Sequence, residues 1–178
     1  MYETVAQRAN ARRKVLFHSS DECFARLTAC IEKQSHKTLI MWAFELAEES
    51  VQDLIKKYPH DNRPTNALNL SKLWASGEVK MPVAKKAILD CHAMAKEITD
   101  ISDIALCHAI GQACSVVHTR THAPGYPIYE LTAIVRRIGM NEFREAVEQR
   151  INFYIDRLLF WQKQSEKTDL KWANFIDR

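Results

Sequence analysis

Residues 35–58, SHKTLIMWAFELAEESVQDLIKKY, carry a clear helical pattern. Apolar or small side chains recur there every three or four residues, which is the period of an amphipathic α-helix. They are Leu39, Ala43, Leu46, Ala47, Ser50, Leu54 and Tyr58. Pro59 ends the pattern, because proline cannot donate the backbone hydrogen bond that a helix interior needs. We therefore expect one long helix over 35–57 with one buried face.

Similar patterns cover most of the chain on both sides of this helix. Four glycines and five prolines mark the breaks, and no alternating run of β-branched residues supports a strand. We expect helices over about 19–33, 35–57, 68–77, 82–98, 100–123, 128–138 and 141–164, with Ser19, Asp100 and Asn141 among their capping residues. The connections are short, so successive helices should pack antiparallel. The sequence thus predicts an all-α protein, a single array of about seven or eight helices.

The bulk composition indicates one domain. A chain of 178 residues can bury a real core and lies within the usual range for a single domain. We divide it into a basic N-terminal arm or helix over 1–14, a middle part that includes 70–138, and a tail over 165–178. The five cysteines are an odd number without CxxC spacing, which favours free thiols. Neither a secretory signal nor an apolar run of about 18 residues is present, so we expect a cytoplasmic protein without a membrane segment.

The formal charge of +3 comes from the first 14 residues. Arg8, Arg12, Arg13 and Lys14 outnumber Glu3 there, whereas the rest of the chain balances 21 basic against 21 acidic residues. A basic arm can bind nucleic acid, which would make the protein a nucleic-acid-binding regulator. No aromatic residues for base stacking are interleaved with these charges, so a solvated helix end is the favoured interpretation.

Residues 107–126, CHAIGQACSVVHTRTHAPGY, contain three of the seven histidines and two of the five cysteines. On one continuous helix, His118 and His122 would have the spacing of two metal ligands, and Cys114 would lie one turn earlier. Zinc or iron would suit such a set, with Cys91 or His92 as the further ligand. The sequence therefore leaves open a helical metal-binding protein or enzyme that uses the Cys/His cluster of residues 91–122.

Close helix packing explains the same stretch with fewer assumptions. Gly111 and Cys114 are small enough to let helices approach, and a free cysteine behaves as a small buried hydrophobe. The HxxxH pair lacks the glutamate of the HExxH motif, and a Cys91 nucleophile paired with His108 or His118 would have no third group to orient it. We therefore expect no cofactor and assign no catalytic residue. The seven residues 89–95 also echo 105–111, which is too short a match to establish a repeat.

Two further groups of side chains, one aromatic and one acidic, could have either a structural or a functional role. Trp74, Tyr126 and Tyr129 lie beside helix breaks, where aromatic residues usually pack but can also anchor a partner protein. The acidic residues of the long 35–57 helix could form a carboxylate site, but their spacing favours a solvated polar face. They are Glu45, Glu48, Glu49 and Asp53.

Part of the chain resembles a known family. Residues 70–138 are similar to the helical immunity-protein domain of bacterial toxin systems, on the strength of Trp74-x-x-Gly77-Glu78, residues 87–95 and 109–113, His118, His122-Ala123 and Tyr129. The resemblance implies a bacterial, cytoplasmic, non-enzymatic protein that neutralises a cognate toxin by protein-protein binding. It carries over no catalytic residue. The balanced charge of the chain beyond its first 14 residues differs from the acidic surface of many toxin inhibitors. The sequence does not decide whether the protein forms a homo-oligomer.

Overall fold

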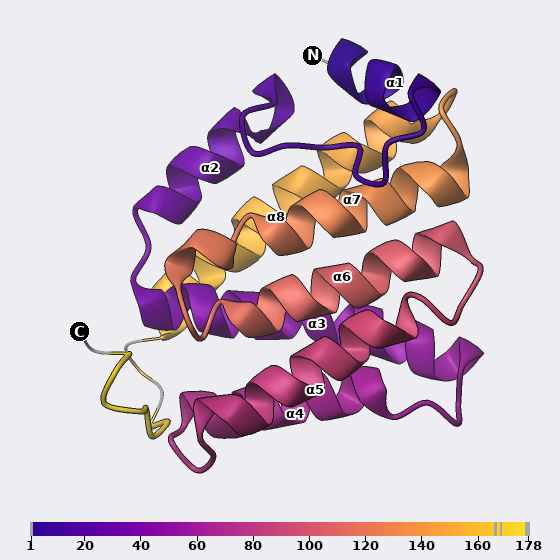
Figure 1. Cartoon of the computed structure of the whole chain (residues 1–178). Coiled ribbons are helices and arrows are strands. Elements are labelled where there is room, and N and C mark those ends of the chain that lie inside the picture. Colours follow the sequence, from indigo (N-terminus) through magenta and orange to yellow (C-terminus); the bar gives the residue numbers. More distant parts are fainter. Residues whose placement is uncertain (1, 166, 168, 177–178) are drawn as a thin grey trace.

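The protein is an all-helical array (Figure 1). The structure, a computed structural model, describes residues 2–165, 167 and 169–176, and these residues include no strand. The α-helices are α1 (Glu3–Asn10), α2 (Ala25–Glu32), α3 (His36–Lys57), α4 (Arg63–Ala75), α5 (Met81–Met94), α6 (Ile101–Ser115), α7 (Gly125–Ile138) and α8 (Phe143–Gln164), and two 3-10 turns are η1 (Glu22–Phe24) and η2 (Arg120–His122). This confirms the predicted fold class.

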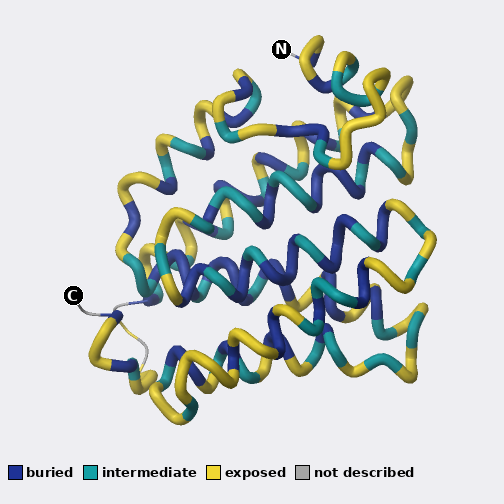
Figure 2. Tube along the Cα trace, in the orientation of Figure 1, coloured by how far each residue is buried: buried dark blue, intermediate teal, exposed yellow. Residues whose placement is uncertain are grey.

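Helix α6 is the centre of the array. It packs against α3, α4, α5 and α7, and the cartoon shows α5 and α7 on either side of it with α3 behind. Its side chains are mostly small and apolar, so it can be buried on nearly all sides. Figure 2 shows it mostly in the colour of buried residues. Helices α4 and α5 form a hairpin at one edge of the molecule, and α1 and α2 lie at the opposite edge.

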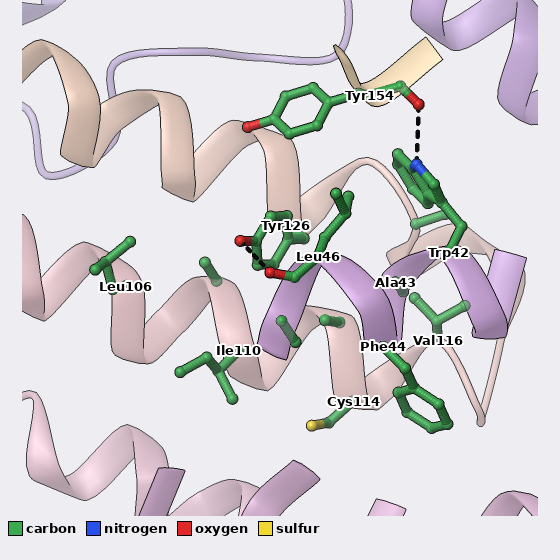
Figure 3. Close-up of a cluster of buried hydrophobic side chains, with 14 of the residues drawn as sticks. Trp42, Ala43, Phe44, Leu46, Leu106, Ile110, Cys114, Val116, Tyr126 and Tyr154 are labelled. Atoms are coloured by element: carbon green, nitrogen blue, oxygen red, sulfur yellow. Dashed lines mark hydrogen bonds between the residues drawn. The ribbon is translucent and has the colours of Figure 1, made fainter. Parts of the chain in front are cut away.

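Large aromatic side chains fill the space between α3, α7 and α8 (Figure 3). The indole of Trp42 donates a hydrogen bond to the backbone carbonyl of Tyr154 over 3.0 Å, and the Tyr126 hydroxyl donates to the carbonyl of Leu46 over 2.6 Å. The rings of Tyr126 and Tyr154 meet edge to face. Because each buried polar atom of these three side chains has a partner, the aromatic residues can be buried at little polar cost.

Several predicted helix ends are confirmed. Asp100 caps α6 as predicted, by accepting hydrogen bonds from two amides, and Ser35, the predicted start of the long helix, accepts one from the Thr38 amide at the start of α3. Gly77 and Gly139 follow α4 and α7 with φ values of +81° and +92°, a conformation that glycine adopts without strain.

Several predicted boundaries are wrong. Helix α4 begins at Arg63 rather than at 68, α5 ends at Met94 rather than at 98, and α7 begins at Gly125 rather than at 128. Residues 19–22 do not form a capping box, because the chain enters α2 through the turn η1 and Asp21 faces Arg8 instead. Helix α8 begins at Phe143 without a side-chain cap, so Asn141 is not its cap. The helix expected over 100–123 ends at Ser115, as described below.

The described residues near both ends of the chain, in α1 and in 169–176, include side chains that are buried against the helices. In the tail, the Ala173 amide donates to the carbonyl of Ala75 over 2.8 Å, and the side chain of Ile176 is buried. At the N-terminus, the α1 side chain Val5 is fully buried. None of the helices in the described part of the chain combines the length and the apolar character that crossing a membrane requires.

Candidate functional site

Five half-buried polar side chains come from neighbouring elements, and we call them together the histidine face. They are His92 of α5, His108 and Gln112 of α6, His122 of η2, and Tyr129 of α7. His108 and Gln112 are four residues apart, which places both on the outer side of α6. The other three side chains reach this strip from the two helices that flank α6 and from the turn before α7.

His92 and His108 form the centre of the histidine face. Their Nδ1 atoms are 2.9 Å apart, and their ring centroids are 5.0 Å apart. At this distance one Nδ1 must carry a proton and donate it while the other accepts. The His108 ring also packs against the Tyr129 ring, with 5.3 Å between centroids.

The sequence echo between 89–95 and 105–111 has a structural counterpart here. Residues sixteen apart in the sequence face each other across the α5–α6 hairpin. The Cys91 thiol donates to the carbonyl of Cys107 over 3.6 Å, and the next residue of each helix forms the histidine pair. The echo therefore reflects the contact between two helices.

Two glycines let the histidine face pack closely. A Cβ at Gly111 would lie 2.3 Å from the His92 ring, and a Cβ at Gly125 would lie 2.5 Å from the Gln112 amide oxygen. Neither position could hold a larger residue without moving its neighbour. The same Gln112 oxygen is 2.9 Å from Nδ1 of His122, which positions this imidazole at the start of α7.

All three imidazoles of the histidine face are uncharged at neutral pH. Burial and the nearby charge of His108 lower the pKa of His92 to about 4. Burial also lowers the pKa of His108, with a smaller effect of Lys14, and lowers the pKa of His122, with a smaller effect of His118. Two charged rings with centroids 5.0 Å apart would repel by about 3 kcal/mol at an effective dielectric constant of about 20.

The structure does not bring the predicted metal ligands together. Helix α6 ends at Ser115, where Ser115 donates its hydroxyl to the Gly111 carbonyl, and Thr119 is extended. The Val116 carbonyl bonds to Nε2 of His36 instead of continuing the helix. Cys114, His118 and His122 therefore do not share one helical face, which corrects the geometry assumed from their spacing.

The candidate ligands lie in different environments. Cys114 is 0% exposed, and burial raises the pKa of its thiol to about 12. His118 is exposed and stacks on the Trp74 ring, with 6.4 Å between centroids. Contact with Cys107 and burial raise the pKa of the Cys91 thiol well above its ordinary value. Among the residues that the structure describes, no three His, Cys, Asp or Glu side chains are grouped so that they could hold a metal ion.

The aromatic residues expected to anchor a partner divide into two groups. Trp74 and Tyr126 are 5% and 0% exposed, because they fill core positions. Neither can contact a partner while the fold is closed. Tyr129 is half-buried and presents part of its ring beside His108. Of the three, it alone lies in a position to meet another protein.

A buried polar cluster was not predicted from the sequence. Glu130 of α7 accepts a hydrogen bond from the Tyr154 hydroxyl, lies 3.2 Å from the Tyr126 hydroxyl oxygen, and pairs with Arg150 of α8 at 2.5 Å. On a helical wheel Glu130 lies one turn after the core residue Tyr126, which was the available indication that it is buried. A glutamate in a helix is ordinarily solvated, so the residue type alone did not predict that Glu130 is buried.

The acidic residues of α3 pair with other helices rather than forming a site. The pairs are Glu45–Arg157, Glu48–Lys72, Glu49–Arg150 and Asp53–Arg137. Ion pairs at this degree of exposure contribute little stability individually. They nevertheless correct the expectation that this face interacts only with water.

One of the four basic residues of the N-terminal arm, Arg8, makes contacts within the fold. Arg8 pairs with Asp21 at 2.6 Å and donates to the Leu16 carbonyl at 2.9 Å. Arg12, Arg13 and Lys14 are exposed. The cationic surface of the arm is therefore smaller than the sequence suggested.

Comparison with known families identifies the group to which this fold belongs. A family model described as Imm-5 like putative immunity protein matches residues 29–157, which run from α2 into α8. The chain belongs to this family. The match extends on both sides of the resemblance seen over 70–138, and all five residues of the histidine face lie inside it. Among curated proteins and solved structures, no significant match was found.

Proposed function

We propose that this Imm-5 like protein is a non-enzymatic bacterial immunity protein that neutralises a cognate toxin by binding it in the cytoplasm. The observation that carries the proposal is the family match over residues 29–157, because this range contains the central helix α6 and the helices packed against it. The partner would be a protein, the toxin itself, rather than a nucleic acid or a membrane.

The chemistry of the site supports binding rather than catalysis. Cys91 and Cys114 are fully buried, and their surroundings raise both thiol pKa values, so neither would provide a reactive thiolate at neutral pH. The histidines of the face are uncharged and hydrogen-bonded to each other or to Gln112. A base in a nucleophilic pair would instead contact the nucleophile.

The histidine face is the surface that we assign to the toxin. Its side chains are held in place by mutual contacts, so little rotamer freedom would be lost when a partner docks. They lie on helices rather than on long loops, which keeps the surface rigid. The exposed edges of neutral imidazoles, an amide and a phenol offer both donors and acceptors of hydrogen bonds. Tyr129 supplies the aromatic area that interfaces favour.

A neutralisation assay in cells tests this function. A candidate toxin domain, chosen from the genes that flank this one, is induced in a sensitive bacterium, with and without this protein. We expect growth to be restored by the native protein and by Phe160→Ala, which alters an exposed aromatic residue on α8. We expect Tyr129→Ala to lose most of the protection. Growth arrest in the presence of well-expressed native protein would contradict the proposal.

A further inference from the structure

We propose that the hydrogen bond between His92 and His108 is an acid-sensitive latch that holds α5 against α6, and that the latch opens when both imidazoles carry a proton. The latch is a property of the fold and does not depend on the proposed function. We also expect toxin binding to weaken when the latch opens, because both residues belong to the histidine face. This second expectation rests on the proposed function.

The geometry of the pair sets how many protons it can hold. With the Nδ1 atoms 2.9 Å apart, an uncharged pair needs one ring protonated at Nδ1 and the other at Nε2. Adding one proton preserves the bond, because a charged ring can still donate to the free Nδ1 of its neighbour. Adding a second proton leaves two donors facing each other without an acceptor. The bond is then lost and two like charges remain side by side.

The surroundings hold both rings in contact with the flanking helices. His92 is wedged against Gly111, with the ring where a Cβ at that position would be, and His108 is backed by Tyr129. Helix α5 packs mainly on α4 and α6, at the edge of the array. Of the two helices that carry the pair, α5 has fewer neighbours than the central α6, so a movement of α5 disturbs the core less than a movement of α6.

The neighbouring groups do not offset a second charge on the pair. From the N-terminal segment, the positive charge of Lys14 acts on His108 and disfavours its protonation. From α7 the pair meets the neutral Tyr129 ring, and on α5 and α6 the adjacent groups are the protonated thiol of Cys91 and the backbone of Cys107. Each of these named groups is neutral or positive, so acid destabilises the closed latch.

Nuclear magnetic resonance of the full chain tests the latch directly. The imidazole resonances of His92 and His108 are followed from pH 8 to pH 3, together with the backbone amides of α5 and α8. We expect the two rings to titrate as a coupled pair, in two steps separated by about one pH unit or more. The second step should coincide with shifts in the α5 amides, while the α8 amides stay unchanged.

Variants separate the latch from a general response to acid. In His108→Gln, we expect His92 to titrate in one step and the acid-induced shifts of α5 to disappear. His60→Gln, in the exposed loop before α4, should leave both effects intact. If His108→Gln does not fold, His92→Gln provides the same comparison from the other ring, and the native titration alone still decides the coupling.

Two results would overturn the latch. One is independent titration of the two rings near the ordinary histidine value. The other is a response of α5 to acid that equals the response of α8. If the titration is coupled but no toxin is bound at any pH, the latch stands and the proposed function fails. If toxin binding is strong but unaffected between pH 7 and pH 4, the function stands without this regulation.

Discussion

The His92 imidazole occupies the space that any side chain at position 111 would need. A Cβ added to Gly111 would lie 2.3 Å from two atoms of this ring, closer than real contacts allow. Gly111 therefore sets the distance between α5 and α6 at the centre of the histidine face. The packing function expected of this glycine is thus tied to one particular imidazole.

Gly111→Ala should destabilise the protein by about 1–3 kcal/mol, because the added methyl group overpacks the contact with His92. The sign of this change in the free energy of unfolding is informative, because alanine in a helix interior ordinarily stabilises a protein by about 1 kcal/mol relative to glycine. Urea unfolding followed by circular dichroism measures the effect. In a His92→Ala background the cost of Gly111→Ala should shrink or reverse. A stabilising effect in the native background would disprove the steric role.

Stability should fall in acid because of the histidine pair. The folded pKa of His92, about 4, lies below its ordinary value of 6.5, so the folded state binds fewer protons than the unfolded state. The contribution is complete above about pH 6.5 and is lost as the pH falls toward 4, with a total of about 1–3 kcal/mol. Urea midpoints measured from pH 7.5 to pH 3.5 should show this decline. The double variant His92→Gln/His108→Gln should have a flatter profile than His60→Gln, and parallel profiles would exclude the pair as the cause.

Glu130→Ala should be the most damaging of the carboxylate substitutions, at about 3–5 kcal/mol, because it leaves the buried Tyr154 hydroxyl without an acceptor and leaves Arg150 with only its exposed partner Glu49. Glu49→Ala removes a half-exposed partner of the same Arg150 and should cost at most about 1 kcal/mol. Chemical denaturation of both variants provides the comparison. Equal costs would show that the buried cluster has no special role.

Arg8→Ala should cost about 1–3 kcal/mol, because Asp21 is only 7% exposed and would lose its charged partner. Arg12→Ala, four residues further along, changes an exposed side chain and should stay within about 0.5 kcal/mol. Thermal unfolding distinguishes the two. An Arg8 variant as stable as the native protein would mean that the arm is not anchored by this pair.

Much of the fold could be predicted because its signals are local. The period of apolar residues in 35–57, the caps at Ser35 and Asp100, and the glycines after α4 and α7 each act within one or two turns of helix. The boundary at Ser115 could not be predicted in this way. It depends on the bond between His36 and the Val116 carbonyl, two residues that are eighty positions apart.

The candidate site was predicted only in part, for the same reason. The sequence pointed to the histidines of residues 91–122, but the metal hypothesis assumed a helix that continued past Ser115. The pairing of His92 with His108 depends on how α5 and α6 pack, which no local spacing encodes. Glu130 escaped detection because its burial follows from the approach of α8, which supplies Arg150 and Tyr154.

The central claim is that the protein neutralises a toxin by binding it, and a titration of toxin activity tests this most directly. Purified toxin at a fixed concentration is mixed with increasing amounts of this protein, and the remaining activity is measured at several incubation times. Binding predicts that activity reaches zero at a fixed stoichiometric ratio, independent of time, and that Tyr129→Ala shifts this endpoint while Phe160→Ala does not. Progressive loss of toxin activity at far lower amounts of protein would indicate an enzyme, and unchanged toxin activity at excess protein would contradict the account altogether.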